Sequence, residues 1–185
     1  MAADARIAPG SLVLVSGPSR GGKSRWAECL LTGDPHVTYV ATAAGRPEDA
    51  DWQERLNKHR QRRPEQWTVL EAQEDLALTL MSIDRGQSVL IDALGGYVAW
   101  NLDLEEPAWL RQSEALIQQL NQMNQTRVIV IEETGWGVVP ATRIGCLFRD
   151  RLGELAQALQ VHADASWLVL QGRAINLQTH SFAVP

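Results

Sequence analysis

The sequence predicts an α/β fold in a single domain over residues 1–185, built on a mostly parallel sheet that helices cover on both faces. Short segments that are apolar throughout alternate along the chain with longer amphipathic or polar segments. Strands that read as continuous apolar runs are typical of parallel sheets, because both of their faces are buried. The length of 185 residues, with 45% hydrophobic and 21% charged residues, suits one globular domain.

The first part of the chain alternates between strand and helix patterns. Residues 11–16 (SLVLVS) are apolar and run into a glycine-rich turn, so they predict a buried strand. A helix is predicted over residues 23–31, and the β-branched run at 37–42 predicts a second strand. Residues 48–61 predict a polar helix, which ends before Pro64 because proline cannot continue it.

The middle of the chain repeats this alternation. Residues 67–70 predict a short strand, and residues 74–83 predict a helix with apolar side chains at regular spacing. Residues 88–92 (SVLID) form an apolar strand pattern that ends in a carboxylate. An amphipathic helix is predicted over residues 110–123.

The last part adds two predicted strands and one long helix. The run RVIVI at 127–131 is apolar except for its first residue, the helix is predicted over 143–159, and a final strand is predicted over 167–170. Residues 1–10 and 176–185 are expected to be tails. These elements complete one α/β unit.

Charge and composition exclude several classes of protein. Seventeen basic and 22 acidic residues give a net charge of −5, which disfavours non-specific binding to nucleic acid or to an anionic membrane. Neither a secretory signal nor an apolar segment of about 20 residues is present, so a cytoplasmic protein without a membrane span is expected. Cys29 and Cys146 are too few for a disulfide framework and are expected to be reduced.

A phosphate-binding loop follows the first strand. The segment fits the pattern G-x-x-x-x-G-K-[ST], in which glycines allow successive amides to surround an anion. Lys23 is predicted to reach the β- and γ-phosphates of a nucleotide, and Ser24 is predicted to bind Mg²⁺. An ordinary glycine-rich turn is the alternative, but the strand before the loop and the helix after it favour nucleotide binding. The predicted nucleotide-binding residues of the loop are Gly17, Pro18, Ser19, Arg20, Gly21, Gly22, Lys23 and Ser24.

Two carboxylates stand at the ends of predicted strands. Asp92 ends the strand 88–92 and is predicted to hold the metal or its water. Glu133 follows the strand 127–131 and is predicted to be catalytic, orienting a nucleophile or the water shell of the metal. The alternative for each is a helix cap or a turn residue.

A basic segment lies inside the polar excursion of residues 43–66, which is expected at the edge of the sheet or at a subunit contact. Residues 55–63 (RLNKHRQRR) hold five basic side chains, and Arg60 and Arg63 are predicted to bind nucleotide phosphates. Neighbouring cations would keep His59 neutral and nucleophilic. A solvated basic helix with a surface histidine is the alternative.

Further motifs follow the order and spacing of a known family. They are the loop at 17–24, YVAT at 39–42, the pattern R-L-x-x-H-R-x-x-R-P at 55–64, Asp92 with Asn101, E-x-G-x-G-V-V-P at 133–140, and F-R-D-x-x-G at 148–153. Over about residues 12–172 the chain resembles the bifunctional adenosylcobinamide kinase/adenosylcobinamide-phosphate guanylyltransferase family of cobalamin biosynthesis. It departs from the family pattern at Pro18 and Gly21, and at Gly95 and Gly96, which replace bulkier residues.

The resemblance implies a RecA-like P-loop fold and a homotrimer. It also implies two activities, which are phosphorylation of the aminopropanol hydroxyl of adenosylcobinamide by ATP or GTP, and transfer of GMP from GTP to that phosphate with release of pyrophosphate. The histidine that carries the guanylyl group in the family falls on His59. Two alternatives remain open from the residues alone, a P-loop small-molecule kinase without guanylyltransferase activity and a non-catalytic nucleotide-binding module.

Overall fold

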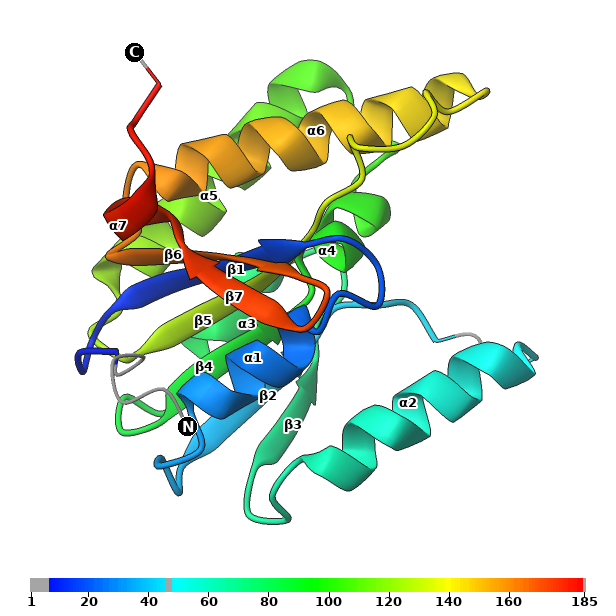
Figure 1. Ribbon diagram of the computed structural model, residues 1–185. Helices are drawn as coiled ribbons and strands as arrows, with labels where there is room; N and C mark the ends of the chain where they lie inside the picture. The colour runs from blue at the N-terminus through cyan, green and yellow to red at the C-terminus, as the bar shows by residue number, and fades with distance from the viewer. Residues whose placement is uncertain (1–6, 46–47, 185) are drawn as a thin grey trace.

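A seven-stranded sheet forms the centre of the computed structural model (Figure 1). The structure describes residues 7–45 and 48–184, and of residues 51–53, 55, 58 and 59 it describes the backbone alone. The strands are β1 (Leu12–Gly17), β2 (Val37–Ala41), β3 (Thr68–Glu71), β4 (Ser88–Asp92), β5 (Arg127–Glu132), β6 (Ala165–Leu170) and β7 (Arg173–Asn176). Their spatial order is β3-β2-β4-β5-β1-β6-β7, and all neighbours are parallel except the antiparallel pair β6 and β7.

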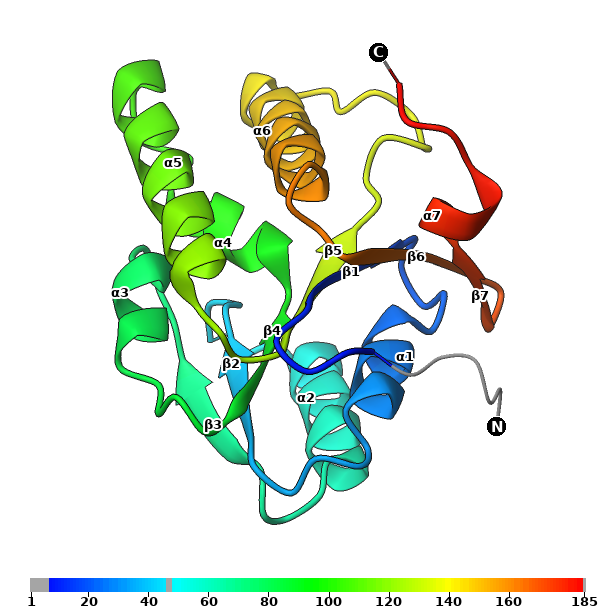
Figure 2. The ribbon, with the colours of Figure 1, turned by 90° about the vertical axis from the view of Figure 1, so that its left-hand side faces the viewer.

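Helices cover both faces of this sheet (Figures 1 and 2). One face carries α1 and α2, and the other carries α3, α4, α5 and α6. The helices are α1 (Lys23–Leu30), α2 (Ala50–Arg62), α3 (Leu76–Met81), α4 (Leu94–Trp100), α5 (Glu106–Gln122), α6 (Arg143–Gln160) and α7 (Leu177–His180). The predicted fold class is confirmed.

Alternation along the strands divides the core into two layers. In β1, Leu12 and Leu14 pack in the cluster that includes α3 to α6, while Val13 and Val15 pack in the cluster that includes α1. Successive side chains of a strand point to opposite faces, so a strand covered on both sides must be apolar at every position. This is why the strands β1, β4 and β5 were recognisable as unbroken apolar runs.

The register of the strands places the carboxyl ends of β1, β4 and β5 at the same edge of the sheet. β5 lies between β1 and β4, with Glu132 opposite Gly17 on one side and Val130 opposite Asp92 on the other. The carboxyl ends of these three parallel strands therefore meet. In open parallel sheets the crevice outside the carboxyl ends of the strands is where ligands bind.

Some expectations about the elements were wrong. Helix α4, strand β7 and helix α7 were not predicted, because all three are short and α4 contains two glycines. Helix α5 begins at Glu106 instead of residue 110, since a proline is accommodated in its first turn. Residues 176–185 are not wholly a tail, because β7 and α7 extend into them.

The polar excursion contains a helix, and the N-terminal segment ends in contact with the residues at the start of β5. Helix α2 lies within residues 43–66 and leads into β3, which is an edge strand of the sheet. Within the expected tail 1–10, the amide of Gly10 donates to Thr126 Oγ1 at 3.1 Å and its carbonyl accepts from Arg127 at 2.8 Å. Residues 1–6 of that expected tail lie outside the described part of the chain.

Candidate active site at the carboxyl ends of β1, β4 and β5

The loop between β1 and α1 has the backbone of an anion-binding site. Gly22 is the N-cap of α1 with a φ of 105°, which favours glycine. A Cβ on Gly17 would lie 2.2 Å from the carbonyl oxygen of Val169, so a side chain there would force β1 and β6 apart. On the far side of the loop, the amide of Gly172 donates to the carbonyl of Gly21 at 3.0 Å. The loop is thus held closely against β6 and the β6–β7 turn.

Lys23 lies inside this loop, as the motif predicts. It is the first residue of α1, it is 6% exposed, and its Nζ donates to the carbonyl of Pro18 at 3.2 Å. The amide of Gly21 donates to the same carbonyl at 3.1 Å. The ammonium group is therefore held across the loop, close to the amides that would receive phosphate oxygens.

Ser24 and Asp92 meet although 68 residues separate them. Ser24 Oγ donates to Asp92 Oδ1 at 3.3 Å, and Tyr39 donates its hydroxyl to Asp92 Oδ2 at 2.8 Å. The hydroxyl and carboxylate oxygens that were predicted to hold Mg²⁺ are thus in hydrogen-bond contact. Burial, and then the Asp92 charge, raise the pKa of Tyr39, so this phenol stays protonated and donates.

Two successive glutamates stand where β5, the strand next to the loop, ends: Glu132 is its last residue and Glu133 follows it. The predicted residue, Glu133, has a partly exposed side chain, and its amide donates to the carbonyl of Gly17 at 2.9 Å. The other, Glu132, accepts a hydrogen bond from the amide of Gly95 on Oε2 at 2.9 Å. Burial is the main cause that raises the pKa of Glu132, and the nearby charge of Asp92 acts in the same direction.

Glu132 is a residue of the site that was not predicted from the sequence. Its signal was present, since Glu132 is the last residue of β5 just as Asp92 is the last residue of β4. Glu133 is predicted instead because it ends the run VIVIEE at 128–133, and it also fits the family pattern. Glu132 is the last residue of β5 and Glu133 follows it outside the strand, so the two carboxylates occupy different positions, and it is the carboxylate of Glu132 that meets Gly95.

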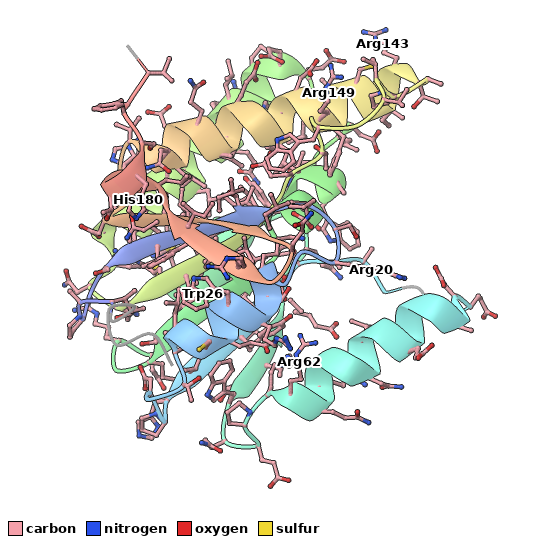
Figure 3. The ribbon with its side chains drawn as sticks, viewed as in Figure 1. Arg20, Trp26, Arg62, Arg143, Arg149 and His180 are labelled. Atoms are coloured by element: carbon pink, nitrogen blue, oxygen red, sulfur yellow. The ribbon has the colours of Figure 1, made fainter. Side chains whose placement is uncertain are left out.

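The C-terminal end of α2 is attached to the site through two arginines. Arg62 makes a two-pronged contact with Glu28 on α1, with both N–O distances at 3.1 Å, and Figure 3 shows Arg62 at the end of α2 toward α1. The guanidinium carbon of Arg63 lies 3.9 Å from the ring centroid of Tyr39. Tyr39 thereby connects α2 to Asp92, a link that the sequence did not suggest.

The remaining predicted residues occupy different positions. Arg60 is exposed on α2, and the backbone of His59 lies in the same helix while its side chain lies outside the described residues. Ser19 and Arg20 are exposed in the phosphate loop, and Figure 3 shows Arg20 between that loop and α2. Asn101 is 2% exposed and donates to the carbonyls of Glu74 and Tyr97, so it ties α4 to the chain after β3.

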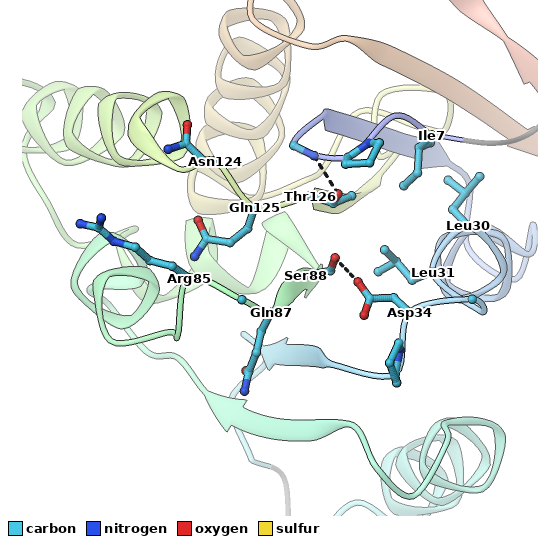
Figure 4. Close-up of a pocket in the computed structure, with 15 residues that line it drawn as sticks. Ile7, Leu30, Leu31, Asp34, Arg85, Gln87, Ser88, Asn124, Gln125 and Thr126 are labelled. Carbon is cyan, nitrogen blue, oxygen red and sulfur yellow. Dashed lines mark hydrogen bonds between the residues drawn. The ribbon is translucent and has the colours of Figure 1, made fainter.

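Two cavities of about 520 Å³ each are lined by residues other than those of the candidate site at the carboxyl ends of β1, β4 and β5. The first opens at the amino ends of the strands and is lined by Asp34, Arg85, Ser88 and Thr126 among others (Figure 4). Ser88 begins β4 whereas Asp92 ends it, so this cavity lies at the opposite end of the sheet from the phosphate loop. The second lies beside Trp100 at the end of α4.

Among the described residues, no helix is long and apolar enough to cross a bilayer. In the same part of the chain, no group of three or more histidine, cysteine, aspartate or glutamate side chains could hold a metal ion on its own. A metal at Ser24 and Asp92 would therefore complete its ligands with phosphate oxygens and water. Mg²⁺ is bound in this manner at many phosphate-transfer sites.

Comparison with known proteins places these features in a family. The model of the family described as cobinamide kinase/cobinamide phosphate guanyltransferase matches residues 13–177. The bifunctional adenosylcobalamin biosynthesis protein CobU of Escherichia coli (strain K12) is 30% identical over 182 residues, which cover 90% of this chain and 99% of that protein. The bifunctional adenosylcobalamin biosynthesis protein CobP of Pseudomonas aeruginosa is 34% identical over 169 residues, which cover 89% of this chain and 96% of that protein.

A solved structure supports the fold alone. A protein of Pyrococcus horikoshii OT3 superposes with a TM-score of 0.56 at 7% identity, over 92% of this chain and 87% of that chain. The resemblance drawn from the motifs is confirmed, and with it the class of enzyme, a bifunctional kinase and guanylyltransferase family of cobalamin biosynthesis. The chain belongs to the cobinamide kinase/cobinamide phosphate guanyltransferase family.

Proposed function

We propose that this chain phosphorylates the aminopropanol hydroxyl of adenosylcobinamide with ATP or GTP and then transfers GMP from GTP to that phosphate. The observation that carries the proposal is the contact of Ser24 with Asp92 at 3.3 Å beside the buried Lys23. Family membership supplies the substrates. A non-catalytic binding module would need neither the metal-side carboxylate nor its contact with Ser24.

In the kinase step, the protein acts through position and charge. The loop amides and Lys23 would hold the β- and γ-phosphates, and the lysine would offset the negative charge that spreads over the transferring phosphoryl group. Glu133, whose amide bonds to the end of β1, would orient the acceptor or the water around the metal. The acceptor oxygen forms the new P–O bond as the bond to the leaving diphosphate breaks.

Mg²⁺ is the metal that fits these residues. Ser24 and Asp92 offer one hydroxyl and one carboxylate, the hard oxygen ligands that Mg²⁺ prefers, and they already lie within hydrogen-bond distance. When bound, the ion would neutralise phosphate charge. Tyr39 holds the other carboxylate oxygen of Asp92 and so orients the group that faces the ion.

In the guanylyltransferase step, His59 would act as the nucleophile. One imidazole nitrogen would attack the α-phosphorus of GTP, the N–P bond would form, and pyrophosphate would leave with the electrons of the broken P–O bond. A phosphate oxygen of adenosylcobinamide phosphate would then displace the histidine. Arg60 is exposed and could meet phosphate oxygens, whereas Arg63 is engaged with the ring of Tyr39, which leaves it a supporting role for α2.

The experiment that tests this function uses GTP labelled with ³²P at the α-phosphate. The wild type and His59→Ala are incubated with Mg²⁺, denatured and assayed for label on the protein. An acid-labile, base-stable label on the wild type and none on the variant is the expected result. An unlabelled wild type that still phosphorylates adenosylcobinamide would show a kinase without guanylyltransferase activity.

Assembly and location complete the proposal. We propose a homotrimer in the cytoplasm, on the strength of the family resemblance and of the absence of a membrane-spanning helix among the described residues. Light scattering on the purified protein would then give three times the chain mass of 20.5 kDa. A monomeric or dimeric mass would contradict the proposed trimer.

A further inference from the structure

Glu132 is a carboxylate in the kinase site that the family pattern does not assign. It ends β5, the strand between the strand of the phosphate loop and the strand of Asp92, and in the sheet it stands opposite Gly17. Its neighbouring strands are β1, which leads into the phosphate loop, and β4, which ends at Asp92, and the charges of Lys23 and Asp92 both act on its carboxyl group. We propose that Glu132 accepts the proton of the acceptor hydroxyl in the kinase step.

The absence of a side chain at Gly95 makes room for the carboxylate of Glu132. The amide of Gly95, near the start of α4, donates to Glu132 Oε2 at 2.9 Å. A Cβ on Gly95 would lie 2.7 Å from Oε2 and 3.0 Å from the carboxyl carbon, so any larger residue would displace the group. Glycine at position 95, where the family pattern has a bulkier residue, is thus explained by the carboxylate that packs against it.

The carboxylate of Glu132 can accept more than its bond from Gly95. Oε2 accepts from the amide of Gly95, and a carboxylate offers about four lone-pair sites over its two oxygens. The side chain is partly buried, with Asp92, Lys23 and the Gly95 amide as its polar neighbours. Burial raises the pKa of Glu132, which brings its proton affinity nearer to neutral pH, where a general base is most effective.

The chemistry balances with the groups present. The hydroxyl oxygen of adenosylcobinamide forms a bond to the γ-phosphorus of ATP, the bond from that phosphorus to the β,γ-bridging oxygen breaks, and ADP leaves. The hydroxyl proton passes to the carboxylate of Glu132 and is returned to solvent after product release. No oxidant or further reactant is needed. The inference rests on the proposed kinase activity and adds to it the residue that removes the proton.

The test compares Glu132→Gln with Glu114→Gln in the full-length enzyme. Glutamine keeps an oxygen acceptor for the amide of Gly95 but cannot take up a proton, while Glu114 is an exposed carboxylate on α5 that bonds to Gln118 at 3.1 Å. Phosphoryl transfer from γ-labelled ATP to adenosylcobinamide is measured across pH. For Glu132→Gln we expect kcat to fall about 10²-fold or more, the acid limb of the pH profile to vanish, and KM for ATP to change less than about threefold.

A second assay separates a chemical role from a structural one. Guanylyl transfer to adenosylcobinamide phosphate, supplied directly, does not need this proton transfer and should be retained in Glu132→Gln. Equal loss of both activities, or an unchanged kinase kcat, would overturn the inference. A wild type that does not phosphorylate adenosylcobinamide at all would instead overturn the proposed function.

Glu132→Asp keeps the test decisive if the glutamine variant does not fold. Aspartate retains the charge but is one methylene shorter, so it withdraws the base from the substrate. We expect a folded protein, judged by circular dichroism, with kinase kcat reduced at least about tenfold and ATP affinity preserved. A kcat equal to that of the wild type would contradict the role of Glu132.

Discussion

The guanidinium of Arg62 donates two hydrogen bonds to the carboxylate of Glu28, one from Nε and one from the terminal nitrogen, both at 3.1 Å. This contact joins the helix that carries the histidine motif to the helix that begins at the phosphate loop. A forked pair of this geometry fixes orientation as well as distance. This pair, together with the contact of Arg63 with Tyr39, therefore connects the elements proposed for the two activities.

A double-mutant cycle should measure that connection. For Arg62→Gln, Glu28→Gln and the double variant we expect a coupling free energy of unfolding of about 1 kcal/mol or less, because the Arg62 side chain is 36% exposed and water screens the pair. Guanylyl transfer should fall more than kinase activity in Arg62→Gln. Denaturant titration gives the free energies, and zero coupling would show that the pair does not hold α2.

Lys23→Ala should abolish the kinase step. The ammonium of Lys23 is buried across the phosphate loop, where it would offset the charge of the transferring phosphoryl group. We expect kcat to fall by about 10²–10³-fold or more, as when one preorganised electrostatic donor is removed. Transfer of γ-labelled phosphate to adenosylcobinamide measures it, and turnover that survives the substitution would refute the assignment of the loop.

Tyr39→Phe should weaken the metal site without releasing α2. The variant loses the hydroxyl that donates to Asp92 at 2.8 Å but keeps the ring against which Arg63 packs. We expect a loss of about 1 kcal/mol of stability and a higher Mg²⁺ concentration for half-maximal kinase activity. Thermal unfolding and a Mg²⁺ titration would measure these changes, and an unaltered titration would indicate that Tyr39 does not orient Asp92.

Gly95→Ala should destabilise the protein, whereas Gly153→Ala should not. The added methyl group at position 95 would meet the carboxylate of Glu132, and the cost expected for such overpacking is about 1–3 kcal/mol. Gly153 lies on α6 with no atom within 4 Å of an added Cβ, so alanine there should gain about 0.5–1 kcal/mol from helix propensity. Urea denaturation of both variants measures the change in the free energy of unfolding. Equal changes for the two variants would contradict the close packing of Glu132 against Gly95.

The stability of the protein should depend on pH through Glu132. Because burial raises the pKa of Glu132, the folded protein holds this proton to a higher pH than the unfolded chain does. The stabilisation is complete below the ordinary glutamate pKa of about 4.5 and is lost as the pH rises through the higher folded value. Glu132→Gln should therefore gain stability relative to the wild type between pH 4 and pH 8, and a constant difference in urea denaturation would contradict the raised pKa.

The fold class, the family and the phosphate-binding loop could be predicted from the residues alone. Continuous apolar runs identified the buried strands, because a strand covered on both faces has no polar position to offer, and the loop from Gly17 to Ser24 was legible because its glycines and its lysine are required at set spacings. The placement of Asp92 followed from the same logic. Short elements such as α4 and β7 were not predictable, since too few residues carry their pattern.

Which side chains meet across long separations in the chain depends on how the elements are arranged in space. The contacts of Glu132 with Gly95, of Arg62 with Glu28 and of Arg63 with Tyr39 join residues on different elements, and no local pattern encodes them. They follow from the strand order, which places β5 between β1 and β4 and so brings Glu132 to the centre of the site. The periodicity of apolar residues along the chain indicates which face of a helix or sheet a side chain points to. The strand order then determines which residues of other elements lie against that face.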